Sequence, residues 1–504
     1  MPQFFLGPAL TRRALPLLAA FAVTLAGTTI PAHALEGKAL FEKFFKSDTQ
    51  ISYDNVSESA GGSFSATGVT IKYATGDRVS TIQGLDVKGL RETTEGRIAF
   101  DSISATELKG QGRGNDGPFT IEGIAFQDAE VPFEIWKDGL TAEEKKQRIK
   151  IGTLALTGFS FQQKSGDKFN AGSLNLTNAD VPLDWRFDPK SNADATADGS
   201  AAPMTFDLFS ISGLSGATKQ GVSWDAETIA IVGASIPTSI GATVDDWMKV
   251  YKSVNVGRIT AALGGVQVFS MDGMTASIGQ PDNEGTIPSF SEIKNINVNL
   301  NAIPDPQAKA VMQQLGYETL QLDMVGDGTY NPESGALGIK NMAMNFKDMA
   351  NFNMTYNMTG YTKEVANAVQ QAQLKIAGGA DPQSSYLELL PILSNLKLSD
   401  FKLALTDKSL TGRLLDFQGK QMGTTGDQLA QGAPMMIGLG MGGLNMPEFT
   451  EMVTKAVGTF LTNKGTLSVE AVPAEPVSII NVVLEGQKDP TKVPGMLNLK
   501  VSGN

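Results

Sequence analysis

The segment Ile149–Phe161, with sequence IKIGTLALTGFSF, contains the pattern that decides the fold. Its apolar residues alternate with other residues, as on a strand with one buried face. The alternation shifts by one residue after Ile151 and again after Leu156. On a regular strand each shift would turn the following apolar side chains to the opposite face. A bulge or sharp bend at each break, often occupied by Gly or Asp, restores their inward direction.

The same phase-shifted alternation recurs along the chain. Clear copies lie at Phe119–Phe126, Ile229–Ile236 and Leu396–Leu403, and weaker ones at 82–90, 98–105, 206–211 and 293–300. An uninterrupted meander runs from Leu320 to Met358 and reverses direction at 331–335. We therefore predict a mainly β (α+β) fold. Its long, curved antiparallel sheets carry bulges or kinks around a continuous apolar interior, with short amphipathic helices at their ends and edges.

Helices are expected to be fewer than strands, and several precede a phase-shifted strand. The expected helices are 35–46, 141–148, 243–252, 363–375, 386–393, 409–421 and 447–462. The last expected strands are 466–472, 477–484 and 496–501. This order resembles a degenerate internal repeat with irregular spacing.

Residues 1–34 have the features of a cleavable secretory signal. Arg12 and Arg13 precede an apolar run over 14–27, and Ala32-His33-Ala34 provides a small-x-small cleavage site. The alternatives are an uncleaved anchor and a twin-arginine signal, since 11–15 partly match the latter. We expect export to the periplasm. The expected regions are a signal peptide (1–34), an N-terminal β-rich region (35–280) and a C-terminal β-meander region with helices (281–504).

The amino-acid composition disfavours several classes of function. The chain has no cysteine, and its one histidine, His33, lies in the expected signal. The mature chain therefore lacks a thiolate nucleophile and the usual nitrogen and sulfur metal ligands. Beyond residue 34 it carries 39 basic and 53 acidic residues, a net charge of −14. That excess disfavours binding to nucleic acid and electrostatic attachment to anionic lipid. We expect no cofactor, no metal and no enzymatic activity.

Methionine-rich strands are the first candidate site. Met is flexible and polarisable, which suits a surface that accepts varied apolar ligands, although filling of an ordinary core explains the same residues. Copper(I) binding by thioethers is a further alternative. The candidate apolar-ligand groove consists of Met342, Met344, Phe346, Phe352, Met354, Tyr356 and Met358.

The uncharged segment Gly432–Met446 is the second candidate. It is too short and too poor in helix-forming residues to cross a bilayer. We interpret it as a loop that either dips into a membrane or folds against neighbouring helices. The candidate membrane-contact residues are Met435, Met436, Ile437, Leu439 and Met441.

Three further features have both a functional and a plain structural explanation. The first helix suits a membrane surface or a plug at the end of a sheet. Residues 192–199 resemble part of a calcium loop, but Thr205 stands at the twelfth position, so a solvated loop is the default. Ser394 and Lys397 have Ser-x-x-Lys spacing without any companion motif. Carboxylate pairs are plentiful, but none is marked as a catalytic pair.

With its phase-shifted strands, its leader and the segment Thr406-Asp407-Lys408-Ser409-Leu410, the chain resembles uncharacterised exported proteins of Gram-negative bacteria. More distantly it is similar to AsmA-type envelope proteins. That resemblance implies a long curved sheet forming an apolar trough that moves lipid between membranes. AsmA-type proteins keep an N-terminal anchor, whereas this leader has a cleavage site, which also leaves open a soluble carrier.

Four hypotheses follow. The first is a periplasmic, non-enzymatic protein that binds an apolar ligand, such as lipid, in cell-envelope maintenance, with peripheral membrane contact. The second is a scaffold or assembly factor with a solid β core, which acts through an envelope protein partner. An outer-membrane barrel and an enzyme are the remaining hypotheses, and low aromatic content disfavours the barrel.

Overall fold

The computed structural model describes residues 37–44, 49–73, 79–112, 116–133, 141–183, 203–236, 250–302, 305–377, 379 and 381–504. They form two compact units that divide after Gly257. The expected signal, the calcium-like segment and residues 243–249 of the expected helix over 243–252 lie outside the described residues, and 250–252 are not helical. The expected boundary at 280/281 falls within the second unit.

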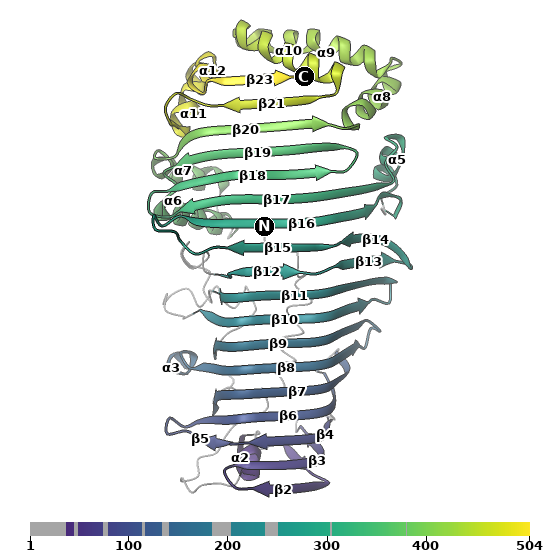
Figure 1. Ribbon diagram of the computed structural model, residues 1–504, viewed down its shortest axis with the longest axis vertical. Helices are drawn as coiled ribbons and strands as arrows, with labels where there is room; N and C mark the ends of the chain where they lie inside the picture. The colour runs from purple at the N-terminus through teal and green to yellow at the C-terminus, as the bar shows by residue number, and fades with distance from the viewer. Residues whose placement is uncertain are drawn as a thin grey trace. The chain divides into compact units, whose positions relative to one another are not determined.

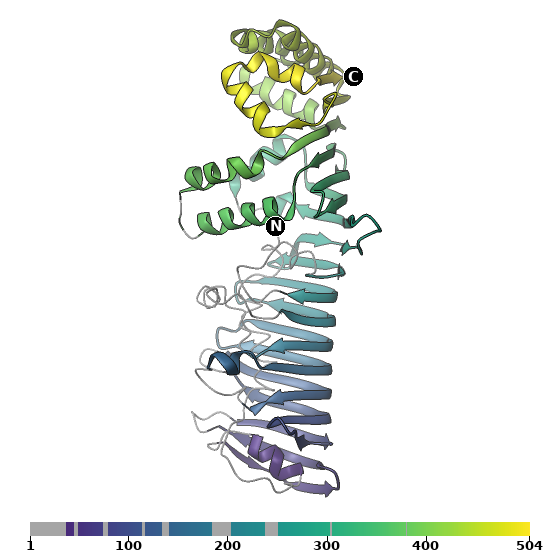
Figure 2. The same ribbon diagram turned by 90° about the vertical axis from the view of Figure 1, so that its left-hand side faces the viewer.

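Unit 1 is an antiparallel meander in which most strands pair with their neighbours in sequence (Figure 1). Its strands are β1 Gln50–Ser52, β2 Asn55–Ser59, β3 Ser63–Lys72, β4 Val79–Lys88, β5 Arg91–Glu92, β6 Arg97–Gln111, β7 Asp116–Pro132, β8 Arg148–Gln163, β9 Lys168–Pro182, β10 Met204–Ala217, β11 Val222–Ile236 and β12 Ser253–Val256. Its helices are α2 Gly37–Phe44 and α3 Ala142–Lys145, and they lie on one side of the sheet (Figure 2).

The kinks predicted from the sequence are confirmed at Gly158 and Gly233, which adopt the left-handed region, whereas Gly152 at the first break of β8 does not. In β8 the break after Leu156 is at Gly158, with φ 61°. On either side of it, Leu156 and Phe159 are both buried, at 2% and 9% exposed. Because a left-handed residue turns the strand, consecutive apolar pairs reach the same face despite the two residues between them.

The kinks form two rows across the sheet. In the first row, the register places Asp128 opposite Gly152, and Gly152 opposite Asn178. Only Asp128 and Asn178 of these three have positive φ, at 50° and 48°, so left-handed residues alternate with extended ones from strand to strand. The second row contains Glu107, Gly158 and Gly213, on alternate strands β6, β8 and β10. Since neighbouring strands bend together, the pairing register is the same on both sides of each row.

Unit 2 begins with another antiparallel meander and ends in a group of helices. Its strands are β13 Ile259–Leu263, β14 Val266–Met271, β15 Gly273–Ile278, β16 Ile287–Asn299, β17 Thr319–Asn331, β18 Ala336–Phe346, β19 Ala350–Thr359, β20 Lys397–Asp407, β21 Thr466–Ala471, β22 Val477–Ser478 and β23 Leu499–Gly503. Its helices are η3 Leu300–Ala302, α5 Pro306–Gln314, α6 Lys363–Ala377, α7 Pro382–Leu393, α8 Leu410–Met422, α9 Gly426–Met441, η4 Gly442–Leu444, α10 Pro447–Asn463, α11 Ile479–Lys488, η5 Pro490–Lys492 and α12 Val493–Met496. Helices α6 and α7 lie side by side on one side of this sheet (Figure 2).

The predicted strand over 477–484 is wrong beyond its first two residues. Only Val477 and Ser478 pair with β20, and the chain then continues as α11. The β-branched residues after Ser478 favour a strand locally. However, the rest of that β20 edge, from Phe401 to Thr406, already pairs with β21. With no free edge left on β20, the segment forms a helix and satisfies its backbone hydrogen bonds internally.

A cluster of side chains fixes the first helix of the C-terminal group against the sheet. Tyr317 is 6% exposed, and its hydroxyl lies 2.9 Å from Ser409 Oγ at the start of α8. The Arg413 guanidinium lies 4.2 Å from the centre of the Tyr317 ring and donates a hydrogen bond to Leu315 O. The carboxylate of Asp407 accepts a hydrogen bond from Thr411 N, which satisfies a donor at the first turn of α8.

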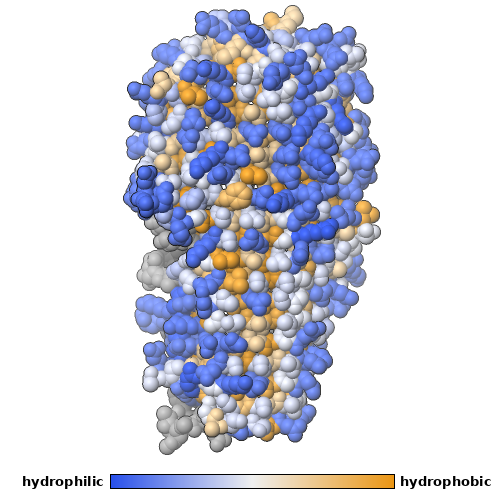
Figure 3. Space-filling view, viewed as in Figure 1, coloured by the Kyte–Doolittle hydropathy of each residue, from blue (hydrophilic) through white to orange (hydrophobic). Residues whose placement is uncertain are grey.

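The apolar residues are buried to different extents in the two units. In β3 and β4 of unit 1, Val69 and Val87 have no exposed surface. Along most of β17–β20 in unit 2, by contrast, the side chains are half-buried. On the face seen in Figure 3, apolar residues form a band along the strand centres, with hydrophilic residues on both sides of it.

The kink rows can be tested with glycine variants. Gly96 has φ 71° and open space around it. Gly96→Ala should therefore lower the free energy of unfolding by about 1–2 kcal/mol through left-handed strain alone. Ala at Gly213 has similar φ, but its Cβ would lie 3.2 Å from Gly172 N on the next strand. We expect Gly213→Ala to cost about 1 kcal/mol more than Gly96→Ala in urea unfolding. Equal losses would contradict a close backbone approach at the kink.

Candidate functional site

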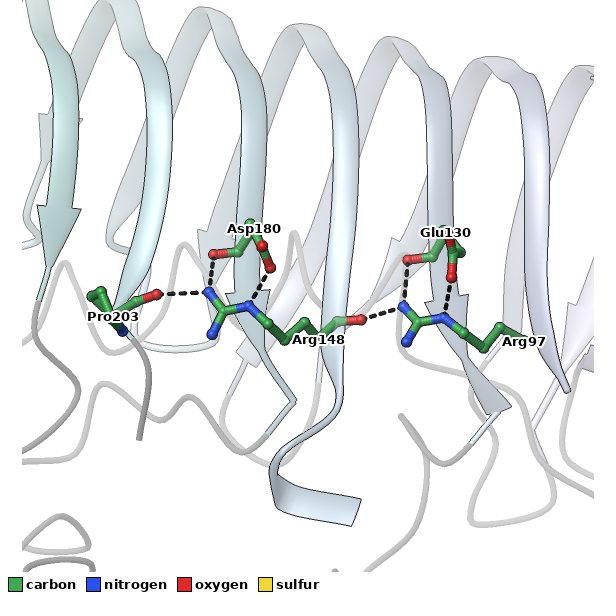
Figure 4. A network of polar contacts seen from close by, with 5 residues as sticks. All are labelled: Arg97, Glu130, Arg148, Asp180 and Pro203. Carbon is green, nitrogen blue, oxygen red and sulfur yellow. Dashed lines mark hydrogen bonds and ion pairs between the residues drawn. The ribbon is translucent and has the colours of Figure 1, made fainter. Parts of the chain in front are cut away.

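The most extensive polar network in unit 1 follows the strand ends (Figure 4). Arg97, at the start of β6, forms an ion pair with Glu130 of β7 and donates a hydrogen bond to Arg148 O of β8. Arg148 repeats the arrangement two strands later. It forms an ion pair with Asp180 of β9 and donates to Asp180 O at 3.0 Å and Pro203 O at 2.6 Å. Each arginine therefore joins consecutive chain segments and satisfies carbonyl groups at the strand ends.

Both arginine charges of this network are paired with oxygen atoms of the fold itself. The Arg97 and Arg148 side chains are 14% and 21% exposed, and both are engaged by carboxylate and carbonyl oxygens. A ligand would have to displace one of these oxygens to reach either guanidinium. We therefore assign the network a structural role.

Loss of this network should destabilise the fold more than loss of an exposed ion pair. Arg148→Met leaves Asp180 without its partner and should cost about 1–3 kcal/mol. The control is Arg91→Met. Arg91 and Asp101 form an ion pair in the same unit with side chains 57% and 64% exposed, so its loss should cost below about 1 kcal/mol. Urea unfolding measures both, and an equal or larger loss for Arg91→Met would contradict the structural assignment.

Titratable and nucleophilic groups have the following surroundings among the described residues. No group of three or more Asp, Glu or His side chains among them is placed to hold a metal ion. Burial, with a smaller contribution from Glu42, raises the pKa of Tyr53 well above its usual range, so this phenol stays protonated at neutral pH. Ser394 lies between α7 and β20, and its hydroxyl donates to Pro391 O at 2.6 Å.

Three tyrosines make stability sensitive to high pH. Burial raises the pKa of Tyr53, Tyr356 and Tyr361 above 10.0. The folded state therefore keeps protons that the unfolded chain loses as the pH rises through about 10, and stability falls from there upward. An absorbance titration at 295 nm, followed together with circular dichroism, should show part of the eight tyrosines ionising only on unfolding. Ionisation of all eight near pH 10 in the folded protein would contradict this.

The structure gathers the predicted methionine-rich residues on neighbouring strands. The register places Met342 opposite Met354 and Met344 opposite Phe352 between β18 and β19, and Tyr356 opposite Phe401 of β20. Alternation puts these side chains on one face of the sheet, and most of them are half-buried. The seven candidate groove residues are thus neighbours: Met342, Met344, Phe346, Phe352, Met354, Tyr356 and Met358.

The predicted loop over 432–446 is wrong in its secondary structure, because most of it is helical. Helix α9 begins at a capping box, in which Thr425 Oγ1 accepts from Gln428 N and the Gln428 side chain accepts from Thr425 N. It continues to Met441 despite Pro434. Packing against α8 and α10 outweighs the low helix propensity of its glycines.

This helix exposes large apolar side chains. Met435, Met436 and Leu439 are 72%, 70% and 73% exposed, the highest values among the large apolar residues described. Burying such side chains elsewhere would release about 1.5–3 kcal/mol each. The remaining candidates, Ile437 and Met441, are half-buried. We call Met435, Met436 and Leu439 the α9 apolar face.

A groove lies beside this face, between α9 and α10, with a volume of about 1120 Å³. Its apolar lining includes Pro434, Met441 and Met446, and its polar lining comes mainly from α10. The helices approach closely at Gly458, where a Cβ would lie 2.7 Å from Pro434 Cγ. A groove of this size exceeds the usual range of about 300–1,000 Å³ for small-molecule sites.

Sequence reasoning missed the α10 wall of the groove. Glu451, Thr454, Lys455 and Gly458 recur at the spacing of one helical face, and all of them line it. The periodicity was visible, but a polar helical stripe normally faces solvent. Only the packing of α9 against α10 shows that this stripe borders an apolar groove.

Comparison with known proteins adds little about activity. Residues 343–504, which include α9, α10 and most of the methionine-rich strands, match the model of a family described as "Uncharacterized protein". No curated protein matches the chain. Within the described residues, no helix combines the length and apolar character needed to span a membrane.

Proposed function

We propose that this chain is an exported, non-enzymatic periplasmic protein that handles lipid or another apolar ligand in maintenance of the cell envelope. It works at a membrane surface, which it contacts through the α9 apolar face. The observation that carries the proposal is the exposure of Met435, Met436 and Leu439 on a helix that the rest of unit 2 holds in place. Exposed apolar patches of this kind mark surfaces that bind a membrane or a partner.

The charge distribution supports a lipid surface as the partner. No charged residue occurs from Gln428 to Pro447, which includes the whole α9 apolar face. From Lys408 to the C-terminus, eight basic and eight acidic residues balance, so the net negative charge of the chain lies outside this region. A neutral region can approach a bilayer without the electrostatic repulsion that the rest of the chain would meet at anionic lipid.

The half-buried methionine-rich face of β18 and β19 supports the same function. Flexible thioether side chains adapt to apolar ligands of different shape. The resemblance to AsmA-type proteins, in which a sheet forms an apolar trough, is consistent with such a role. Under this proposal α9 brings the protein to the membrane, and the apolar surfaces of unit 2 receive lipid.

The α9 apolar face can be tested by vesicle flotation of the purified full chain without residues 1–34. With neutral phosphatidylcholine vesicles, the triple variant Met435→Ser, Met436→Ser and Leu439→Ser should reduce binding at least about tenfold, because three apolar groups no longer leave water. Leu263→Ser with Val266→Ser is the matched control, since these side chains are 41% and 54% exposed on β13 and β14. The control should bind as the parent chain does.

Two results would contradict the proposal. One is a parent chain that does not float with vesicles. The other is equal loss of binding in the triple variant and the control. Recovery of one stoichiometric protein and no lipid after cross-linking in cells would instead favour a scaffold.

A further inference from the structure

We propose that the groove between α9 and α10 binds a single zwitterionic phospholipid, with an acyl chain along Pro434, Met441 and Met446 and the head group at Glu451 and Lys455. This inference rests on the proposed function and names the ligand of the same region. Three observations carry it: the position of the groove, its lining and its two charged side chains.

The groove lies next to the α9 apolar face. Gln431 lines the groove, and Met435 lies one helical turn further along α9, so the two share an edge of the helix. Leu439 follows Met435 by the same spacing. A lipid at a membrane touching this face could therefore enter the groove without its chain crossing water.

The volume and lining of the groove fit a lipid. About 1120 Å³ is larger than most metabolite sites, and the side chains of Pro434, Met441 and Met446 provide apolar contact. Methionine adapts to chains of different length and unsaturation. Gly442 of η4, which also lines the groove, has no atom within 4 Å of the position of a Cβ.

Two opposite charges stand in the α10 wall. Glu451 and Lys455 are one turn apart on the same face, and both are exposed. Neither forms an ion pair within 4 Å among the residues that the structure describes, unlike Lys464 nearby, which pairs with Asp427. An unpaired cation and anion at this spacing complement the phosphate and the ammonium group of a zwitterionic lipid. An anionic head group would satisfy only Lys455.

A polar group in the wall also lacks a partner. Thr454 Oγ1 is buried and has no hydrogen-bond partner in the described structure, although it belongs to the groove lining. By contrast, Thr462 Oγ1 donates to Gly458 O at 2.9 Å. Because Thr454 Oγ1 has almost no exposed surface, it meets a ligand oxygen only after the Thr454 side chain rotates into the groove.

The test uses dihexanoyl phosphatidylcholine and dihexanoyl phosphatidylglycerol, below their micelle concentrations, with the full chain without residues 1–34. Calorimetric titration should show one site that prefers phosphatidylcholine. Lys455→Glu and Glu451→Lys should each weaken phosphatidylcholine binding about tenfold. Glu451→Lys should also reverse the preference toward phosphatidylglycerol. The double exchange of the two charges should restore phosphatidylcholine binding, because the pair is again neutral.

The charge controls are Lys420→Glu on α8 and Glu448→Lys on α10, two exposed positions outside the groove lining. They should leave both affinities unchanged. Equal affinity for the two lipids, unchanged binding in both single variants, or occupation of the groove by a second copy or a peptide would overturn the inference. Vesicle flotation separates this test from that of the proposed function. If Lys455→Glu still floats with vesicles but the calorimetric titration shows no head-group preference, only the inference fails.

Discussion

The sheet of unit 1 depends on left-handed residues placed where the apolar alternation shifts. Without them, half of the apolar side chains on each strand would face solvent, because side chains alternate strictly along an extended chain. Gly158 and Asn178 show that the position requires a conformation more than a particular residue, since both have positive φ. Glycine adopts it without strain, and Asn and Asp tolerate it. The alignment of these residues in two rows lets neighbouring strands bend together and keep their pairing register.

Polar side chains hold the strand ends of unit 1 and the helical group of unit 2 in place. Arg97 and Arg148 join successive strands of unit 1, so their charges serve the fold. In unit 2, Tyr317, Ser409 and Arg413 fix α8, and α9 and α10 pack beyond it. Because these contacts do not cover the outer surface of α9, the helix can remain ordered while its apolar face stays exposed. The α9 apolar face is therefore exposed because the helical group is anchored through α8.

Much of the architecture was predictable. The mainly β class, the antiparallel meander from Leu320 to Met358 and the helices α6, α8 and α10 follow from periodicity and turn residues. The candidate site was predictable in part, since Met435 and Leu439 stood out as apolar residues in an uncharged segment. Their helical conformation was not predictable, because glycine and proline disfavour helices locally and only packing compensates for this. The segment after Ser478 shows the converse, because its local strand preference meets a β20 edge that already pairs with β21.

The direction of each strand's side chains follows from the amino-acid pattern alone, because apolar spacing and backbone alternation are local properties. The same pattern also determines the balance of charge near the C-terminus. Tertiary structure alone decided which polar residues meet the apolar ones. Glu451, Thr454 and Lys455 form an ordinary polar helical stripe in sequence, and they border a groove only because α9 packs against α10. Such contacts join residues of separate helices, and no local pattern specifies how closely two helices approach.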